Sequence, residues 1–277
     1  MTPLLNADWL VPDWPAPPGV HAVFTTRAGG TSSTPWDTMN LGDHVGDVPA
    51  QVAANRARLS AAVGAHAVFL KQVHGSDVRV LDPRTPDGRV ADACVTQDAG
   101  VACTIMVADC LPVLLATACG TVVGAAHAGW RGLAGTAPGP LTGVLEAVYE
   151  SFTALASENI DGIATDLVAW LGPCIGPDAF EVGVEVKAAF EAMDTAAASC
   201  FKAARPGKFM ADLPALARLR LRALGITAIY GNDSSTVWCT ASNPSRFFSH
   251  RRDAGPSLNG GNGFFTTGRM AACIWKD

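Results

Sequence analysis

The sequence predicts a single domain of the α/β or α+β class, and three observations support this fold class. Short apolar runs rich in β-branched residues and bounded by Gly, Asp or Pro are typical of buried strands, and several occur between Val101 and Gly132. Segments with helical spacing of apolar residues lie between such runs, for example over residues 140–156. No repeat or break in composition divides the 277 residues, and 49% of them are hydrophobic, which is enough for one substantial core.

The chain begins with a Pro-rich N-terminal segment, residues 1–19, before the domain of residues 20–277. Val20 to Arg27 is expected to form a strand that ends in a glycine turn. Such a turn would present Arg27 to an anion. A surface arginine beside a turn is an equally good interpretation, since such turns are common.

The remaining elements follow from periodicity and from residues that begin or end helices. We expect a helix capped by Asp47, with Pro49 in its first turn and Gly64 at its end. The segment 67–81 is expected to form two strand pieces hinged at His74. Asp212 is expected to cap another helix. The other expected elements are strands at 91–95, 167–171, 226–230 and 266–275, helices at 140–156, 181–193 and 212–224, and a flexible glycine-rich loop at 254–265.

Composition and charge exclude several classes of protein. The net charge of -5 comes from only 16% charged residues without a block of like charge, which argues against a nucleic-acid or membrane-surface partner. The N-terminal segment is not expected to be a signal peptide. Asp109 and Pro112 interrupt the longest apolar region, so we expect no run of the about 20 apolar residues that span a bilayer. The eight cysteines contain no CxxC pair and are expected to be mostly free. We therefore expect a cytoplasmic protein with a small-molecule substrate, as a monomer or small homo-oligomer.

Three strand-like runs each end near a residue that can bind a metal. These residues are His74, Cys110 after TIMVAD, and His127 after TVVGAA. Ligands gather at strand ends in open sheets, so we expect a Cys/His/His cluster. Their wide separation differs from the close pairs of structural zinc sites, and three protein ligands leave one tetrahedral position open, as in catalytic zinc. Zinc lowers the pKa of bound water from about 15.7 to about 7, and no other feature of the sequence offers so large an effect.

Five neighbours could support chemistry at this cluster. Asp109 could orient a ligand or relay a proton, or it could simply end a turn. Arg131 is suited to an anionic or polar substrate. Trp130 could stack on a planar ring, although a tryptophan beside a strand end more often belongs to the core. Gln72 and Lys71 could donate hydrogen bonds to a substrate.

Other common sites are absent from the sequence. It contains neither GxGxxG after a strand nor GxxxxGK[ST], HExxH or GxSxG, and it lacks the zinc deaminase signature. The remaining histidines have no comparable setting and are expected to be structural or exposed; they include His21, His44, His66 and His250.

Nine segments together resemble one family. They are FTTRAGG, NLGDHVGD, NRARL, KQVHGSDV, the run from ADACV to ADCLPVLLA, AAHAGWRG, LGPCIGPDAFEVGVEV, FFSHRRD and TGRMAACIW. The chain from about residue 20 onward is identified as a member of the bacterial YfiH-type family, also called the laccase-domain or polyphenol oxidase family, which includes the peptidoglycan editing factor. The stretches 134–143 and 254–265 are longer than the family pattern, so substrate preference could differ.

The resemblance implies a fold, a metal and an activity. The fold is a single layered α/β/β/α domain with mixed sheets, similar to the catalytic domain of cytotoxic necrotizing factor. The metal is zinc, with copper less favoured, held by His74, Cys110 and His127. The activity is phosphorolysis of adenosine, inosine and methylthioadenosine, together with deamination of adenosine, so the expected partners are a purine nucleoside and phosphate.

Three alternatives stay open at this point. A copper-dependent polyphenol oxidase could use Met106 as an axial ligand, but six histidines are too few for a complete multicopper relay. Cys110 could instead be the nucleophile of an amide hydrolase acting on cell-wall precursors, with His127 as its base. In the third alternative, the pocket belongs to a metal-dependent partner protein that binds without turnover.

Overall fold

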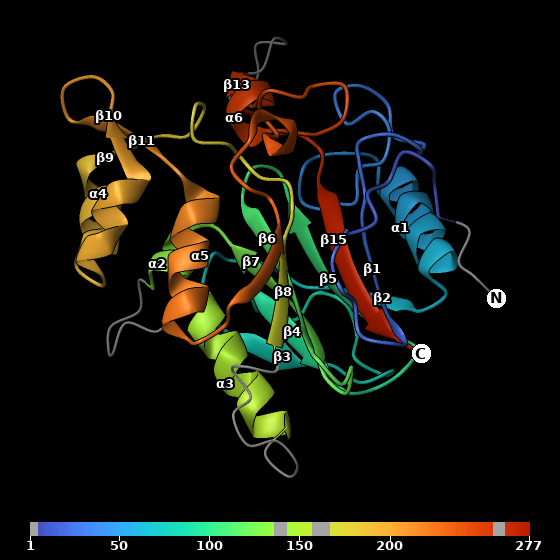
Figure 1. The fold of residues 1–277 in the computed structure, drawn as a ribbon. Helices are drawn as coiled ribbons and strands as arrows, with labels where there is room; N and C mark the ends of the chain where they lie inside the picture. Colours follow the sequence, from blue (N-terminus) through green and yellow to red (C-terminus); the bar gives the residue numbers. More distant parts are fainter. Residues whose placement is uncertain (1–4, 136–142, 157–166, 257–263) are drawn as a thin grey trace.

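The protein folds as two β-sheets stacked face to face with helices on both outer sides (Figure 1). The computed structural model describes residues 5–135, 143–156, 167–256 and 264–277. The four-stranded sheet has the order β1-β15-β5-β2, with β1 at Val20–Phe24, β2 at His66–Phe69, β5 at Val101–Val107 and β15 at Met270–Lys276. The six-stranded sheet has the order β12-β8-β6-β7-β4-β3, with β3 at Val78–Val80, β4 at Ala93–Thr96, β6 at Leu111–Thr117, β7 at Val123–Ala128, β8 at Leu167–Leu171 and β12 at Ala228–Gly231.

Both sheets are mixed, which confirms the predicted fold class. Strands β2 and β5 are parallel, as are β3 with β4 and β8 with β12, while the other pairs in the two sheets are antiparallel. Helix α1 (Pro49–Val63) covers the outer face of the four-stranded sheet, and α3 (Val144–Ala156) with α5 (Leu213–Ala223) covers that of the six-stranded sheet. The likeness to the cytotoxic necrotizing factor domain stays a prediction.

The layers explain why the central strands are apolar throughout. In β5, Cys103 and Ile105 pack between the sheets, whereas Ala102 and Met106 face the layer that contains α1. Successive side chains of a strand point to opposite faces, so a strand covered on both sides shows a continuous apolar run instead of alternation. No helix in the described ranges is long and apolar enough to cross a membrane.

Several predicted element boundaries need correction. The first helix is not capped by Asp47: its N-cap is Val48, without a side-chain hydrogen bond, and Asp47 accepts a hydrogen bond from the side chain of Asn40 instead. The predicted helix over 181–193 begins later, because residues Glu181–Gly183 form strand β9, which pairs with β11. That pairing joins distant segments into a small sheet that local periodicity could not indicate. The remaining elements are α2 at Trp130–Ala134, α4 at Val184–Glu191, α6 at His250–Asp253, β10 at Phe201–Ala203, β11 at Lys208–Ala211, and short 3-10 helices at Thr195–Cys200 and Thr236–Trp238.

Other boundaries agree with the sequence. The side chain of Asp212 caps α5 by accepting a hydrogen bond from the backbone N–H of Ala215 at 2.9 Å. Trp9 of the N-terminal segment is buried, and Leu10 pairs with Phe24 of β1. The two long loops lie largely outside the described residues. The ends of the second loop pair as β13 (Gly255–Pro256) and β14 (Phe264–Phe265).

Candidate metal centre

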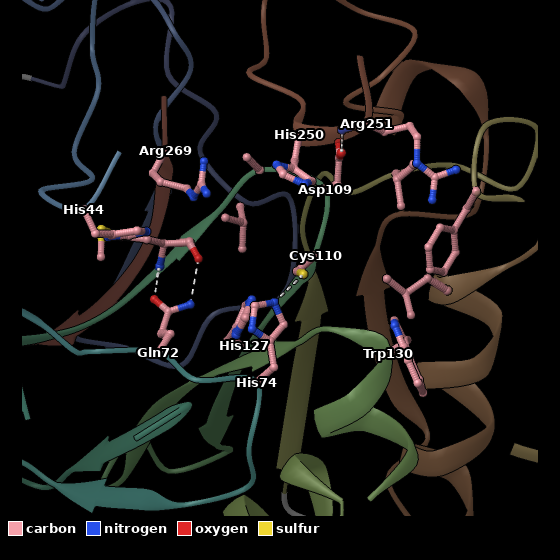
Figure 2. A pocket seen from close by; sticks show the side chains of 16 residues that line it. His44, Gln72, His74, Asp109, Cys110, His127, Trp130, His250, Arg251 and Arg269 are labelled. Atoms are coloured by element: carbon pink, nitrogen blue, oxygen red, sulfur yellow. Dashed lines mark hydrogen bonds between the residues drawn. The ribbon is translucent and has the colours of Figure 1, made fainter. Parts of the chain in front are cut away.

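His74, Cys110 and His127 meet at one end of the six-stranded sheet (Figure 2). Their ligand atoms all lie within 4.8 Å of one another, and Cys110 Sγ is 3.7 Å from His74 Nε2. In a tetrahedral zinc site, bonds of about 2.0 Å to nitrogen and about 2.3 Å to sulfur place the donors about 3.3–3.5 Å apart. The donor set therefore fits a metal ion, provided that the ligand atoms, which lie up to 4.8 Å apart, move closer when they bind it.

Each ligand comes from a different local structure. His127 lies near the end of β7, and Cys110 lies in the turn between β5 and β6. His74 lies in the loop between β2 and β3, well beyond the strand end where the sequence placed it, and has a φ of 62°. The left-handed region is uncommon for a residue with a side chain. Other groups must therefore hold this loop in place.

Asp92, which directly precedes β4, holds the His74 loop. Its fully buried carboxylate accepts hydrogen bonds from the backbone N–H groups of Val73 at 3.1 Å, His74 at 2.8 Å and Gly75 at 2.7 Å. The same carboxylate lies 2.9 Å from Nδ1 of His127. A proton on Nδ1 directs the Nε2 lone pair to a metal, which is the usual support of a ligating histidine. The sequence prediction did not identify Asp92; its one signal was a carboxylate at the start of an apolar strand.

The charges of the centre stabilise one another. Burial acts to raise the pKa of Cys110, but the neighbouring His127 and His74 outweigh it and lower the pKa to about 6. Burial acts to lower the pKa of His127, yet Cys110 and Asp92 raise it to about 9. Desolvation likewise opposes the charged form of Asp92, but hydrogen bonds from His127 and the His74 loop hold its pKa below the usual value. Cys110 is thus readily a thiolate, the form that binds metals.

Gly129 makes room for the ligands. A Cβ at this position would lie 2.9 Å from Cδ2 of His74 and 3.0 Å from Sγ of Cys110. Its φ of -67° and ψ of 158° are accessible to any residue, so the glycine is needed for space and not for its backbone conformation. The glycine between His127 and Trp130 in the HAGW motif therefore has a steric role in the centre.

The three ligands open onto a cavity of about 330 Å³ whose two sides differ in chemistry (Figure 2). One side is polar and is lined by His44, Gln72 and Arg269. The other side is mainly apolar apart from Arg251: Trp130 and Phe180 pack in the same cluster as the buried Ile175 and Leu213. The cavity is also lined by Met106, Val107, Ala108, Asp109, His250 and Arg251.

Of the residues predicted to support the cluster, some line the cavity and others do not. Trp130, Gln72 and Asp109 line the cavity. The side chain of Gln72, however, both donates to the carbonyl and accepts from the N–H of Met106, each at 2.8 Å. The carboxylate of Asp109 accepts hydrogen bonds from Thr240 Oγ1 and from the backbone N–H of Arg251, each at 2.6 Å. Both side chains thus connect walls of the cavity.

The predicted cations Arg27, Arg131 and Lys71 do not line the cavity. The guanidinium of Arg27 donates to the carbonyls of Asp37 at 3.1 Å and Pro244 at 2.8 Å, and that of Arg131 stacks on the ring of Trp130. The cations that do line the cavity are Arg251 and Arg269. His44 and His250, expected to be structural or exposed, are exposed but also line it. His44 lies in the motif NLGDHVGD and Arg269 in the distant motif TGRMAACIW. Their shared place in the cavity depends on the tertiary fold, so the sequence alone did not indicate it.

Comparisons with known proteins identify the family and support the architecture. The profile of the family described as "Multi-copper polyphenol oxidoreductase laccase" matches residues 21–277. A purine nucleoside phosphorylase of Pseudomonas aeruginosa is 47% identical over 98% of this chain and 99% of its own length. Purine nucleoside phosphorylase YfiH of Escherichia coli is 44% identical over 96% of this chain and 98% of its own length.

Solved structures show the same fold. Protein NMB0706 of Neisseria meningitidis is 41% identical, with a TM-score of 0.80 over 98% of this chain and 99% of that one. YlmD of Geobacillus stearothermophilus is 29% identical, with a TM-score of 0.80 over 99% of this chain and 98% of that one. The chain belongs to the laccase-domain family, as its motifs indicated.

Proposed function

We propose that this laccase-domain protein is a zinc-dependent purine nucleoside phosphorylase that also deaminates adenosine. The observation that carries the proposal is the His74, Cys110 and His127 group at the base of a cavity. The volume of about 330 Å³ lies within the range of about 300–1,000 Å³ that is usual for small-molecule sites. Relatives that match almost the whole chain carry the name purine nucleoside phosphorylase. Inosine, adenosine and methylthioadenosine are the proposed nucleosides.

Zinc fits this donor set better than a set of coppers. One thiolate and two imidazoles leave a fourth position for substrate or water, as in catalytic zinc sites. Within the described residues there is one group of metal-capable side chains, so a relay of several coppers finds no ligands there. A single copper bound by the same three residues is the less favoured alternative.

The residues of the chain would divide the work of phosphorolysis. Zinc, when bound, supplies a Lewis acid that stabilises negative charge on an oxygen or nitrogen of the substrate. Trp130 and Phe180 offer apolar and aromatic surface for the planar base. Asp92 fixes the orientation of His127 and the His74 loop, so the site is organised before substrate arrives. Phosphate would then attack the anomeric carbon of ribose as the base leaves.

The test is a product assay on zinc-loaded protein. With inosine or adenosine and phosphate, we expect hypoxanthine or adenine together with ribose 1-phosphate, and inosine from adenosine without phosphate. Chelation should abolish both reactions, and zinc should restore them. Cys110→Ala should lose both activities, whereas Arg79→Met, which alters an exposed residue of β3, should retain them. Absence of free base from wild-type protein in the presence of phosphate would contradict the proposal.

A second candidate function rests on the low pKa of Cys110, about 6, beside His127. A thiolate next to an imidazole is the arrangement of cysteine hydrolases, here acting on cell-wall precursors. Activity in metal-free protein that is abolished by iodoacetamide would favour this function. Loss of activity on chelation, restored by zinc, would count against it.

We also propose a cytoplasmic location. All eight cysteine thiols are free in the structure, which supports a reducing compartment. Fractionation of cells followed by detection of the protein tests this.

A further inference from the structure

Arg269 presents a guanidinium to the cavity, where the charges of Cys110 and Asp109 act on it. Its Nη1 donates to the backbone carbonyls of Thr267 at 2.7 Å and Gly268 at 3.3 Å, which fixes the plane of the group. Within the described part of the chain, no carboxylate forms a salt bridge with it. The nearby carboxylate of Asp109 is already bound by Thr240 and Arg251. A partly buried arginine in this state is suited to bind an anion.

The position of Arg269 is set by a buried asparagine. The side chain of Asn40 is fully buried, and its Oδ1 accepts from the backbone N–H groups of Arg269 and Gly42, each at 2.9 Å. The backbone N–H of Leu41 donates to the carbonyl of Arg269 at 3.0 Å. These bonds join the start of β15 to the loop that carries His44. Backbone and Asn40 hydrogen bonds therefore join Arg269 to the loop that carries His44.

Gly42, two residues before His44, lies against the stem of Arg269. A Cβ on Gly42 would lie 2.7 Å from Cγ of Arg269, so the arginine stem crosses this glycine next to His44. Desolvation and then the charge of Arg269 lower the pKa of His44, while Asp43, whose Oδ1 lies 3.3 Å from Nδ1 of His44, acts to raise it. Two groups that repel each other when both are charged would be stabilised by an anion between them.

We infer that Arg269 and His44 form an oxyanion subsite that holds inorganic phosphate at the polar end of the cavity, opposite the apolar end where Trp130 and Phe180 receive the base. This inference rests on the proposed function and specifies how the substrates are oriented. Figure 2 shows His44 and Arg269 on one side of the three metal-binding residues and Trp130 on the other. Arg251, stacked over Phe180 at 5.7 Å, lies on the side of Trp130 and is assigned to the nucleoside end.

The two-ended arrangement suits the bond changes of phosphorolysis. A phosphate oxygen forms a bond to the anomeric carbon of ribose while the bond from that carbon to the purine nitrogen breaks, and the base leaves with the electron pair and gains a proton. The nucleophile and the leaving group must lie on opposite sides of the anomeric carbon. Holding them at the two ends of one cavity produces that alignment, and alignment is a large part of catalysis in such reactions.

The experiment compares Arg269→Met with wild type and with Arg79→Met, all zinc-loaded. Inorganic phosphate is the probe, and its Kd is measured by calorimetry without nucleoside, beside the KM values of both substrates. For Arg269→Met we expect the Kd and KM for phosphate to rise by at least about 10-fold, as for loss of a charge-assisted contact. The KM for inosine should change by less than about threefold. Arg79→Met should match wild type.

Two further variants separate the ends of the cavity. Gly42→Ala keeps every charge but displaces the stem of Arg269, so it should weaken phosphate binding without changing nucleoside binding. Trp130→Ala should weaken nucleoside binding without changing phosphate binding. Adenosine deamination, which uses no phosphate, should be retained in Arg269→Met.

The outcomes are distinct. An unchanged phosphate KM and Kd in folded Arg269→Met overturns the inference, as does phosphate binding that depends on zinc but not on Arg269. If wild type releases no base but still binds phosphate through Arg269, the proposed function fails and the subsite stands. If wild type neither binds phosphate nor releases base, both fail.

Discussion

Asp92 and Asp109 are two buried aspartates near the same cavity, and they stabilise different parts of it. Asp92 accepts hydrogen bonds from the His74 loop and from His127, so its partners include two residues of the candidate metal centre. Asp109 accepts hydrogen bonds from Thr240 and from the backbone of Arg251, so its partners belong to the opposite wall. Asp109 is adjacent to Cys110 in the sequence, whereas Asp92 is distant from all three ligands. The comparison shows that support of the metal centre follows from hydrogen bonds and not from sequence adjacency.

Removal of the Asp92 carboxylate should have the largest effect. Asp92→Ala would leave the N–H groups of the His74 loop and Nδ1 of His127 without an acceptor in a buried place. We expect zinc affinity to fall by about 100-fold or more. The free energy of unfolding should fall by about 3 kcal/mol or more. Competition with a chromophoric chelator and urea unfolding measure the two effects.

Asp92→Asn is the conservative form of the same test. The amide keeps the shape and one acceptor oxygen, so the loss of zinc affinity should be intermediate, at about 10-fold. Zinc affinity equal to wild type in both variants would show that Asp92 does not support the centre.

Asp109→Asn should destabilise the protein and leave the metal centre intact. Asparagine tolerates the positive φ of 92° at this position, so the substitution removes charge without adding backbone strain. Weaker bonds to Thr240 and Arg251 should reduce the free energy of unfolding by about 1–3 kcal/mol. Zinc affinity should stay within about threefold of wild type, because no ligand loses a partner. A fall in zinc affinity as large as that of Asp92→Asn would show that Asp109 supports the metal centre as much as Asp92 does.

The layered fold was largely predictable because its central strands are buried on both faces. Continuous apolar runs predicted β5, β6 and β7, and the cap at Asp212 predicted the start of α5. The small sheet of β9, β10 and β11 was not predicted. Its strands are short, and they are stabilised by pairing with one another across the chain, as in Val182 opposite Phe209. Single-sequence periodicity carries no information about such pairing.

The clustering of the three side chains was predictable from the sequence, and the residues that surround the cluster were not. Residues with soft or borderline donors at strand ends pointed to His74, Cys110 and His127. The cations of the cavity were harder to predict. Arg27 lies beside a glycine turn, as an anion-binding arginine can, yet its guanidinium donates to the carbonyls of Asp37 and Pro244. Arg269 lies in the cavity because β15 pairs with β5 and Asn40 binds its backbone. Only the tertiary structure distinguishes these two arginines.

Gly129→Ala tests whether the metal centre depends on space as well as on hydrogen bonds. The new Cβ would press on His74 and Cys110 without removing any ligand, acceptor or charge. We expect zinc affinity to fall by about 5–10-fold and the free energy of unfolding by about 1 kcal/mol, as in modest overpacking. Gly88→Ala is unsuitable as a control because of its φ of 81°, so Ala61→Ser at an exposed position of α1 serves as the control that adds one heavy atom away from the centre. Zinc affinity equal to wild type in Gly129→Ala would mean that the His74 loop moves to make room for the new methyl group without weakening the centre.

A third aspartate, Asp253, extends the comparison to the wall that carries Arg269. Its carboxylate accepts bonds from the guanidinium of Arg252 at 2.6 and 2.8 Å, from the backbone of Ser249 at 3.1 Å and from Thr267 Oγ1 at 3.0 Å. Burial acts to raise the pKa of Asp253, but these bonds, first that of Arg252, lower it below the usual value. A carboxylate with a lowered folded pKa stabilises the protein above its unfolded pKa, and the stabilisation is lost as the pH falls through the folded value.

Asp253→Asn should therefore show the smallest effect and a specific pH dependence. At pH 7 the variant should be less stable by about 1 kcal/mol, a modest value because the carboxylate is partly exposed. The difference from wild type should stay constant down to about pH 5 and shrink below about pH 4, near the unfolded carboxyl pKa of about 3.9. Urea unfolding of both proteins across this range measures the difference. A difference that grows on acidification would mean that the charged carboxylate destabilises this wall, in contrast to Asp92 and Asp109.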